Sequence, residues 1–270
     1  MRSTFMRWYR FFLLTLMVGF FALPGETNSV VVTPPRLQFT AGDDGYFEGQ
    51  IEVYGAKDKD TMVKTFFMDW AFDQNGTVQF FTQSGQVERS ATAWLQIKPE
   101  EFLIPAGSKK VVTVSGRVPP GTPPGDYWSM FFVEFLPYSV LQTSGVQISG
   151  RVGGSVTVTV PGPALRKGHI ASFQINAVTN KGKPGLEANL VFVNEGDSVV
   201  EPSGYINILD YQNKSHGSIR IADFKVLPKS TRELQFTADL SLKPGAYVAI
   251  AVLDYGGETQ TGYQKVFTVK

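Results

Sequence analysis

The sequence has 270 residues, of which 43% are hydrophobic and 18% are charged, so it carries enough apolar material for one large domain or two of ordinary size. Its 25 basic and 24 acidic residues leave no net field that would attract nucleic acid or an anionic membrane surface. There is no cysteine, and the two histidines are His169 and His216. This composition excludes disulfide frameworks, cysteine-ligated metals and thiol nucleophiles, and we expect neither a metal nor another cofactor.

The N-terminus has the layout of a secretory signal. The first ten residues are rich in arginine, and the apolar run FFLLTLMVGFFALP at 11–24 carries no charge. This run is shorter than the roughly 20 residues of a membrane-spanning helix. We therefore predict a signal peptide over residues 1–29, cleaved after Gly25 or Ser29, and export to the periplasm or the extracytoplasmic envelope without stable membrane insertion. The alternative is that the segment is retained as an N-terminal anchor.

The rest of the chain has the period-two alternation of β-strands and almost no helical periodicity. Asn75-Gly76 lies between two apolar runs and predicts a hairpin, because both positions tolerate a positive φ. Many short strands at this spacing indicate antiparallel β-sandwiches. The candidate strands are Ile51–Tyr54, Val63–Phe72, Thr77–Phe81, Val111–Val118, Tyr127–Leu136, Val146–Val160, Gly204–Asp210, Arg232–Ala238 and Tyr247–Asp254.

A weak internal repeat sets the number of domains. The segment Ile104–Phe135 is echoed by Val226–Tyr255: each has a proline-containing turn, a strand, and a tyrosine that opens an apolar strand. We predict an all-β protein with two immunoglobulin-like β-sandwich domains, at 30–161 and 162–270. The PGP at Pro161–Pro163 would separate them, since proline cannot donate in a β-ladder. We expect few contacts between the domains beyond a cleft near this boundary.

Two tyrosines occupy equivalent positions in the repeat. Tyr127 and Tyr247 each close a Pro-Gly-x-Tyr sequence, two residues after its glycine. We interpret both as corner tyrosines, in which the hydroxyl hydrogen-bonds to a neighbouring backbone group.

Side chains that could support catalysis are scarce. No Gly-x-Ser-x-Gly elbow is present, and the acidic clusters lie mostly in turn-like contexts that indicate solvated loop charge. An enzyme is therefore the least favoured class. The acidic candidates are Asp43-Asp44, Asp58 with Asp60, Asp69, and Glu100-Glu101.

The segment Val146–Val160 has an unusually long alternation. Every even position is apolar or glycine, and the odd positions are polar or glycine. As a single strand it would extend about 50 Å, more than twice the usual length. One interpretation is a bent strand, or two strands, closing the core of the first domain. The other is a strand that overruns its own sheet and offers an apolar row and free backbone groups to a partner.

Several segments in order resemble the periplasmic pilus chaperones of the chaperone–usher pathway, the PapD-like family. TPPRLQF at 33–39 resembles the first strand, IPAGSKKVVTV at 104–114 a turn and strand, and SMFFVEFLP at 129–137 the strand before the donor strand. VQISGRVGGSVTVTVPG, which ends at Gly162, is similar to the donor strand itself. The resemblance covers most of residues 30–161 and is architectural in the second domain. It implies a non-enzymatic chaperone that binds and caps pilin-like or surface protein subunits by β-strand donation.

The resemblance also implies which residues would bind the subunit. Arg36 would hold the subunit's C-terminal carboxylate, and the donated apolar row would comprise Ile148, Val152, Val156 and Val158. The family has a lysine on the donor strand as a second anchor. Ser155 stands at that position here, and Arg151 is the only cation on the strand.

Two other classes of protein fit the two-sandwich pattern. Surface adaptors of Gram-positive cell walls, which partner WxL-domain proteins, carry a similar first domain but usually end in a membrane helix, whereas this sequence ends in YQKVFTVK. A generic secreted sandwich that binds a polymer or coats a surface is the remaining alternative.

Overall fold

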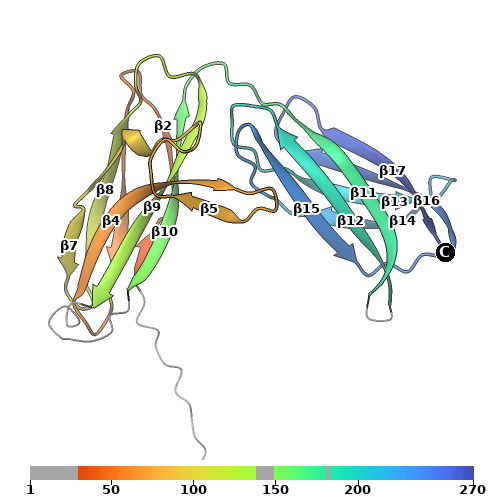
Figure 1. The fold of residues 1–270 in the computed structure, drawn as a ribbon, viewed down its shortest axis with the longest axis horizontal. Helices are drawn as coiled ribbons and strands as arrows, with labels where there is room; N and C mark the ends of the chain where they lie inside the picture. The colour runs from red at the N-terminus through yellow and green to blue at the C-terminus, as the bar shows by residue number, and fades with distance from the viewer. Residues whose placement is uncertain (1–29, 138–148, 181–182) are drawn as a thin grey trace, which may run out of the picture.

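The computed structural model describes residues 30–137, 149–180 and 183–270, which form almost exclusively β-structure (Figure 1). A 3₁₀ turn at Thr92–Trp94 is the helical element in these ranges. The predicted signal peptide and Ile148 lie outside the described residues. The strands form two β-sandwiches in succession along the chain, which confirms the predicted fold class.

The N-terminal sandwich packs two sheets face to face. One has the strand order β1-β3-β8-β6, and the other has the order β2-β10-β9-β4-β5 with β7 also paired to β4. The strands are β1 (Val31–Thr33), β2 (Arg36–Thr40), β3 (Tyr46–Tyr54), β4 (Thr61–Phe72), β5 (Val78–Phe81), β6 (Leu95–Lys98), β7 (Glu101–Ile104), β8 (Lys109–Arg117), β9 (Gly125–Pro137) and β10 (Gly150–Val160).

The C-terminal sandwich is built in the same way. Its sheets have the orders β11-β12-β15 and β14-β13-β16-β17. The strands are β11 (Gly168–Asn180), β12 (Lys183–Asn194), β13 (Ser203–Leu209), β14 (Ser215–Ile221), β15 (Ser230–Ala238), β16 (Gly245–Asp254) and β17 (Thr261–Val269). The segment between β10 and β11 is not in a strand, and it contains the predicted boundary at Pro161–Pro163.

Each sandwich encloses its own apolar core, as the alternating pattern requires. In the first, fully buried side chains such as Ile51, Val112 and Phe131 come from facing sheets. In the second, Phe173 and Ile206 play the same part. Alternate residues of each strand therefore bury their side chains between the sheets, as a period of two predicts.

The two predicted corner tyrosines are confirmed. The Tyr127 hydroxyl donates a hydrogen bond to the Pro123 carbonyl at 3.1 Å. The Tyr247 hydroxyl donates to the Lys243 carbonyl at 3.0 Å. Both rings are buried, so each hydroxyl satisfies a backbone acceptor at the entrance to its strand.

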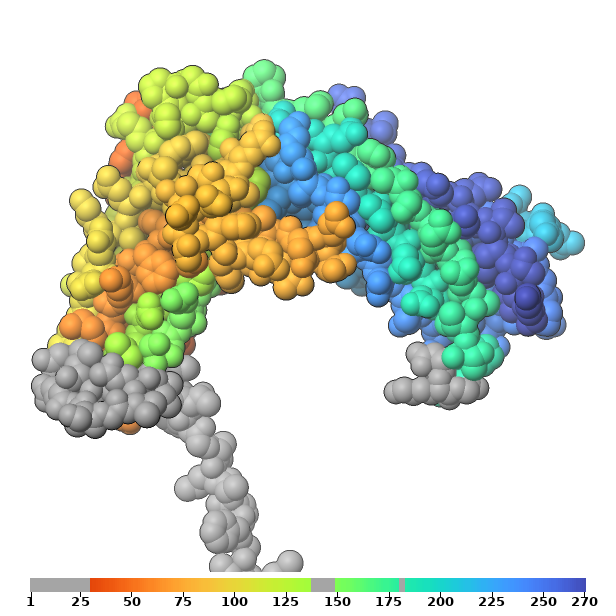
Figure 2. Space-filling model, in the orientation of Figure 1, coloured from red at the N-terminus to blue at the C-terminus, as the bar shows by residue number. Residues whose placement is uncertain are grey.

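The two sandwiches contact each other more extensively than we expected from the sequence. Trp70 and Trp128 of the N-terminal sandwich form a buried apolar cluster with Leu227 of the C-terminal sandwich. The hairpin β4–β5 reaches across to β15 (Figure 1). Figure 2 shows the result as an arched body with a hollow under its centre.

The hairpin predicted from Asn75-Gly76 is present, with a positive φ at Gly76 but not at Asn75, and its turn contacts the second sandwich directly. The Gln74 carbonyl accepts the Glu233 N–H at 2.7 Å. The Arg232 guanidinium carbon lies 4.7 Å from the centre of the Phe72 ring. Gly76 has φ 89°, and a Cβ there would overlap the Arg232 guanidinium. The positive φ favours glycine in the turn, and any larger residue would also displace the Arg232 guanidinium from its position over Phe72.

A polar contact joins the sandwiches beside the apolar cluster. Arg89 donates to Asp197 at 2.8 Å, and Lys229 lies 3.2 Å from the same carboxylate. Asp126 donates its N–H to the Asp197 carbonyl and accepts the Val199 N–H, both at 2.8 Å. Burial alone would raise the pKa of Asp197, but its hydrogen bond to Lys229, its other bonds and the neighbouring cations together hold that pKa below the usual 3.8.

Candidate partner-binding site

Strand β10 has an edge that is only half covered. Along its whole length, from Gly150 to Val160, it pairs antiparallel with β9. On its other side it pairs parallel with β2 only from Ser155 to Thr159. Within the described residues, the edge at Gly150–Gly154 is therefore not paired with any strand.

The direction of the hydrogen bonds shows which backbone groups face this open edge. The Ser155 N–H donates to the Pro35 carbonyl at 3.0 Å, so this residue presents its polar groups to the side on which β2 lies. Backbone groups alternate in direction along a strand. The N–H and C=O of Arg151 and Gly153 therefore point to the open edge, where an added strand could pair with them.

The glycines of β10 make room for phenylalanine rings. A Cβ at Gly150 would overlap the Phe135 ring, and one at Gly154 would overlap the Phe131 ring. Glycine at these two positions allows the aromatic rings of β9 to pack closely over the neighbouring strand.

The predicted apolar row divides into residues with different surroundings. Val152 is half-buried and packs at the margin of the core. Val156 and Val158 are fully buried, with 0% exposure, in the core of their own sandwich. Our prediction that these two side chains are offered to a partner is therefore contradicted, because the facing sheet already covers them. Ile148 lies outside the described residues.

Arg151 lies on the outer face of the same sheet. Its guanidinium carbon is 5.1 Å from the centre of the Phe66 ring and 5.4 Å from that of Phe132. A guanidinium nitrogen lies 3.6 Å from a Glu134 carboxylate oxygen. Arg151 thus covers aromatic surface next to the open edge, on the sheet face that Ser155 and Arg36 share.

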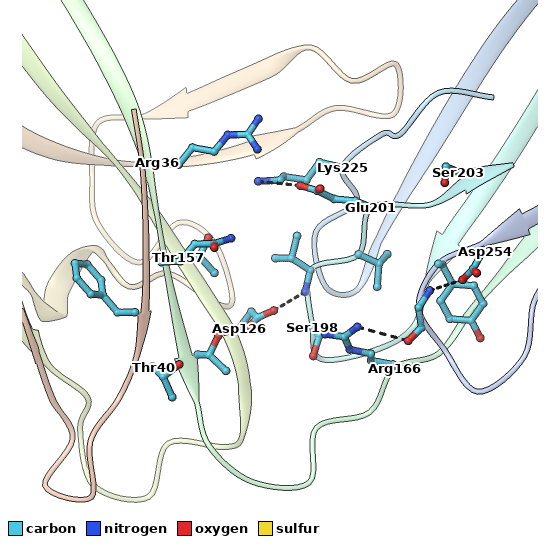
Figure 3. A pocket seen from close by; sticks show the side chains of 17 residues that line it. Arg36, Thr40, Asp126, Thr157, Arg166, Ser198, Glu201, Ser203, Lys225 and Asp254 are labelled. Atoms are coloured by element: carbon cyan, nitrogen blue, oxygen red, sulfur yellow. Dashed lines mark hydrogen bonds and ion pairs between the residues drawn. The ribbon is translucent and has the colours of Figure 1, made fainter. Parts of the chain in front are cut away.

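Arg36 opens β2 and lies at the cleft between the two sandwiches (Figure 3). It is exposed and has no hydrogen bond or ion pair with any residue that the structure describes. The structure pairs it in register with Ser155. Ser155 is thus directly beside Arg36 on the neighbouring strand.

The cleft has a volume of about 690 Å³ and contains charged groups that the sequence analysis did not identify. Lys225 and Glu201, both from the C-terminal sandwich, lie 3.6 Å apart at its rim. Arg166 donates to the Gly256 carbonyl at 3.5 Å. No local motif surrounds these side chains, and only the packing of the two sandwiches brings them to Arg36.

The acidic candidates from the sequence are either buried and hydrogen-bonded within the fold or exposed to solvent. Asp69 is buried and accepts hydrogen bonds from the Gln86 N–H at 2.8 Å and the Ser90 hydroxyl at 2.5 Å. The other pairs are exposed. In the part of the chain that the structure describes, no group of three or more His, Asp or Glu is placed to hold a metal ion. No helix within the same ranges has the length and apolar character needed to cross a membrane.

No protein-family model and no curated protein matches the sequence. Among solved structures, the chain is similar to a chaperone–tip adhesin complex of CFA/I fimbriae, with 12% identity, 88% of this chain and 98% of that chain covered, and a TM-score of 0.48. It is similar to the class 5 fimbriae chaperone CfaA, with 14% identity, coverage of 90% and 100%, and a TM-score of 0.47.

A third similar structure is the CsuC–CsuE chaperone–tip adhesion subunit pre-assembly complex from archaic chaperone–usher Csu pili of Acinetobacter baumannii, with 15% identity, coverage of 88% and 98%, and a TM-score of 0.44. Each of these three solved structures contains a chaperone from a fimbrial or pilus system.

Proposed function

We propose that this protein is an exported, periplasmic chaperone that binds a pilin-like or other surface protein subunit by pairing it with the open edge of β10. The observation that supports this function is the interrupted pairing of β10, which leaves Gly150–Gly154 without a strand on one side. An exposed strand edge promotes aggregation, so its retention in a folded protein favours a use in binding. No enzyme chemistry and no cofactor are required for this activity.

Strand addition gives both affinity and register. Each backbone hydrogen bond contributes about 0.5–1.5 kcal/mol net, and the bonds at Arg151 and Gly153 would be made whatever the sequence of the partner. Register is then set by side chains, because a shift of one residue turns every side chain to the opposite face. We assign this part to Val152, with Ile148 as a further candidate beyond the described residues.

Arg36 gives the proposed site its charge. The Arg36 guanidinium has no hydrogen bond or ion pair with the residues that the structure describes, and it lies in the cleft beside the end of the open edge. This placement suits a carboxylate at the end of the bound chain. We propose that Arg36 holds the C-terminal carboxylate of the subunit while the preceding residues pair with β10.

A matched pair of variants at one position tests strand addition. Arg151→Ala removes the side chain and keeps the N–H that faces the open edge. Arg151→Pro removes the side chain and that N–H, and it leaves β9 paired on the other side. The measurement is the subunit recovered and identified with the tagged protein from its native envelope, followed by the affinity of that subunit for each variant.

We expect the alanine variant to bind the subunit and the proline variant to lose at least about tenfold in affinity, the equivalent of ~1.4 kcal/mol. Thermal unfolding of the two variants should be similar, since proline is tolerated at a strand edge. Equal subunit binding by both variants would contradict strand addition at this edge.

A further inference from the structure

We infer that Lys225 supplies the second cation of the anion site at Arg36, and that Glu201 occupies Lys225 in the unbound protein as an internal substitute for the ligand carboxylate. The inference rests on the proposed function, because it concerns the same site. It adds a binding residue from the other sandwich and a competition that regulates binding. Figure 3 shows Arg36 and Lys225 extending into one cleft, with Glu201 joined to Lys225.

The positions of these residues favour one shared site. Arg36, Glu201 and Lys225 together line the interdomain cleft and also an adjoining pocket of about 430 Å³. On the strand beside Arg36, the residue in register is Ser155, which cannot supply a charge. A second cation for a carboxylate would therefore come from across the cleft, where Arg166 and Lys225 lie, and of these two Lys225 shares both pockets with Arg36.

The backbone holds Lys225 and Glu201 opposite each other. Val200 and Val226 exchange both backbone hydrogen bonds, at 3.0 and 2.9 Å, in an isolated antiparallel bridge. Lys225 and Glu201 are the adjacent residues on the two sides of this bridge. Their pairing is thus fixed by the fold of the C-terminal sandwich and does not depend on a bound ligand.

The ion pair between Lys225 and Glu201 has the geometry of a replaceable contact. The charged atoms are 3.6 Å apart, beyond the distance of a good charge-assisted hydrogen bond. The Lys225 side chain is 21% exposed, whereas the Glu201 side chain is 53% exposed. The less exposed Lys225 side chain is therefore held in place by its surroundings. The Glu201 side chain can move into solvent at little cost in free energy when another carboxylate takes its place.

Other charged groups of the cleft are already occupied. Asp126 accepts the Thr159 hydroxyl at 2.6 Å and the Val199 N–H at 2.8 Å, so both of its oxygens are engaged. Asp254 accepts the Gly256 N–H at 2.9 Å. If a ligand carboxylate replaced Glu201, Lys225 would remain paired. Arg36, which has no anionic partner among the described residues, would gain one from the ligand.

The experiment uses a probe that carries a carboxylate but is too short to add a strand. The blocked dipeptide N-acetyl-alanyl-alanine, as the free acid and as its C-terminal amide, is titrated into the full-length exported protein and followed by NMR. The variants are Lys225→Gln, Lys225→Arg and Glu201→Gln. Matched controls with the same changes of charge at exposed, remote positions are Lys214→Gln and Glu187→Gln.

We expect the free acid to bind and the amide not to bind. Lys225→Gln should weaken binding of the acid about tenfold, the loss of one charge-assisted bond, and Lys225→Arg should retain it. Glu201→Gln should tighten binding several-fold, because it removes the competitor. The two control variants should change the affinity much less than the variants in the cleft.

Three results would overturn the inference: equal binding of acid and amide, unchanged binding in Lys225→Gln, or weaker binding in Glu201→Gln. Failure of strand addition is a separate result. The Arg151 variants test pairing with β10, whereas the dipeptide reports only on the charges of the cleft.

Discussion

The contrast between Val152 and Val156 gives the most direct test of how β10 is divided between its own core and a partner. Both side chains point to the same face of one strand, and both can be changed to serine. Val156 is 0% exposed, whereas Val152 is half-buried at the margin of the core. The same chemical change should therefore have different effects on stability at the two positions.

The magnitudes follow from burial. Val156→Ser removes buried methyl groups and places a hydroxyl in an apolar core, which together cost about 2–5 kcal/mol. A loss of ~3 kcal/mol would lower the Tm of a sandwich of this size by about 10–15 °C. At Val152 the hydroxyl reaches water and less apolar area is lost, so we expect a cost below about 1.5 kcal/mol.

The tryptophans provide a fluorescence signal from the N-terminal sandwich. Apart from Trp8 in the predicted signal peptide, the tryptophans are Trp70, Trp94 and Trp128, all in the N-terminal sandwich. Trp70 and Trp128 also contact Leu227 of the C-terminal sandwich, so fluorescence during unfolding reports the domain that contains β10 together with its contact to the other sandwich. Subunit binding is measured on the same samples and should fall in Val152→Ser.

Two outcomes would refute this reasoning. Equal, large losses of stability at Val152 and Val156 would mean that the open end of the strand is closed core. A negligible loss at Val156 would mean that the facing sheet does not cover it.

Further predictions concern the framework that positions the site. Tyr127→Phe should cost about 1 kcal/mol of N-terminal stability in denaturant titration, since it removes one buried hydrogen bond; no loss would remove the corner role. Gly76→Ala should destabilise the contact between the sandwiches more than Gly85→Ala, because both have positive φ but only Gly76 faces the Arg232 guanidinium; small-angle scattering of the interdomain angle checks this, and equal effects would contradict it. The lowered pKa of Asp197 stabilises the folded state above the unfolded value of 3.8, and this stability is lost as the pH falls through the lower folded pKa. Asp197→Asn should flatten that acid dependence of unfolding, and an unchanged profile would count against it.

Patterns within one or two strands could be predicted from the sequence. The Asn75-Gly76 turn needs a residue with positive φ, and the two corner tyrosines need only a neighbouring carbonyl. Both requirements are local, so the sequence shows them. The alternation of Val152, Val156 and Val158 likewise showed that these side chains share a face.

What covers that face depends on contacts distant in sequence. Val156 and Val158 are enclosed because the facing sheet includes β3 and β8, while Val152 lies at its margin. The alternation of odd and even positions distinguishes the two faces of a strand, but it does not show where along the strand the opposite sheet ends. The Lys225–Glu201 pair was missed for the same reason, because the packing of two domains places it beside Arg36.

The register of Arg36 also fixes the direction of the chain that the protein is proposed to bind. Arg36 lies opposite Ser155, at one end of the open edge. A chain whose C-terminal carboxylate is held there, and whose preceding residues lie along Gly154 to Gly150, must run parallel to β10. It would then continue the line of β2, which is itself parallel to β10. The added strand is thus expected to extend the sheet without a change of direction.

Cross-linking can measure this direction, because the chain contains no cysteine and an introduced one is unique. From Val152 to Ser155 the strand advances about 10 Å, at roughly 3.4 Å per residue. Val152→Cys should therefore form a disulfide most readily with a cysteine placed about three residues before the end of the subunit chain. Yields that increase towards the subunit's terminal residue, or that show no dependence on position, would exclude the parallel arrangement anchored at Arg36.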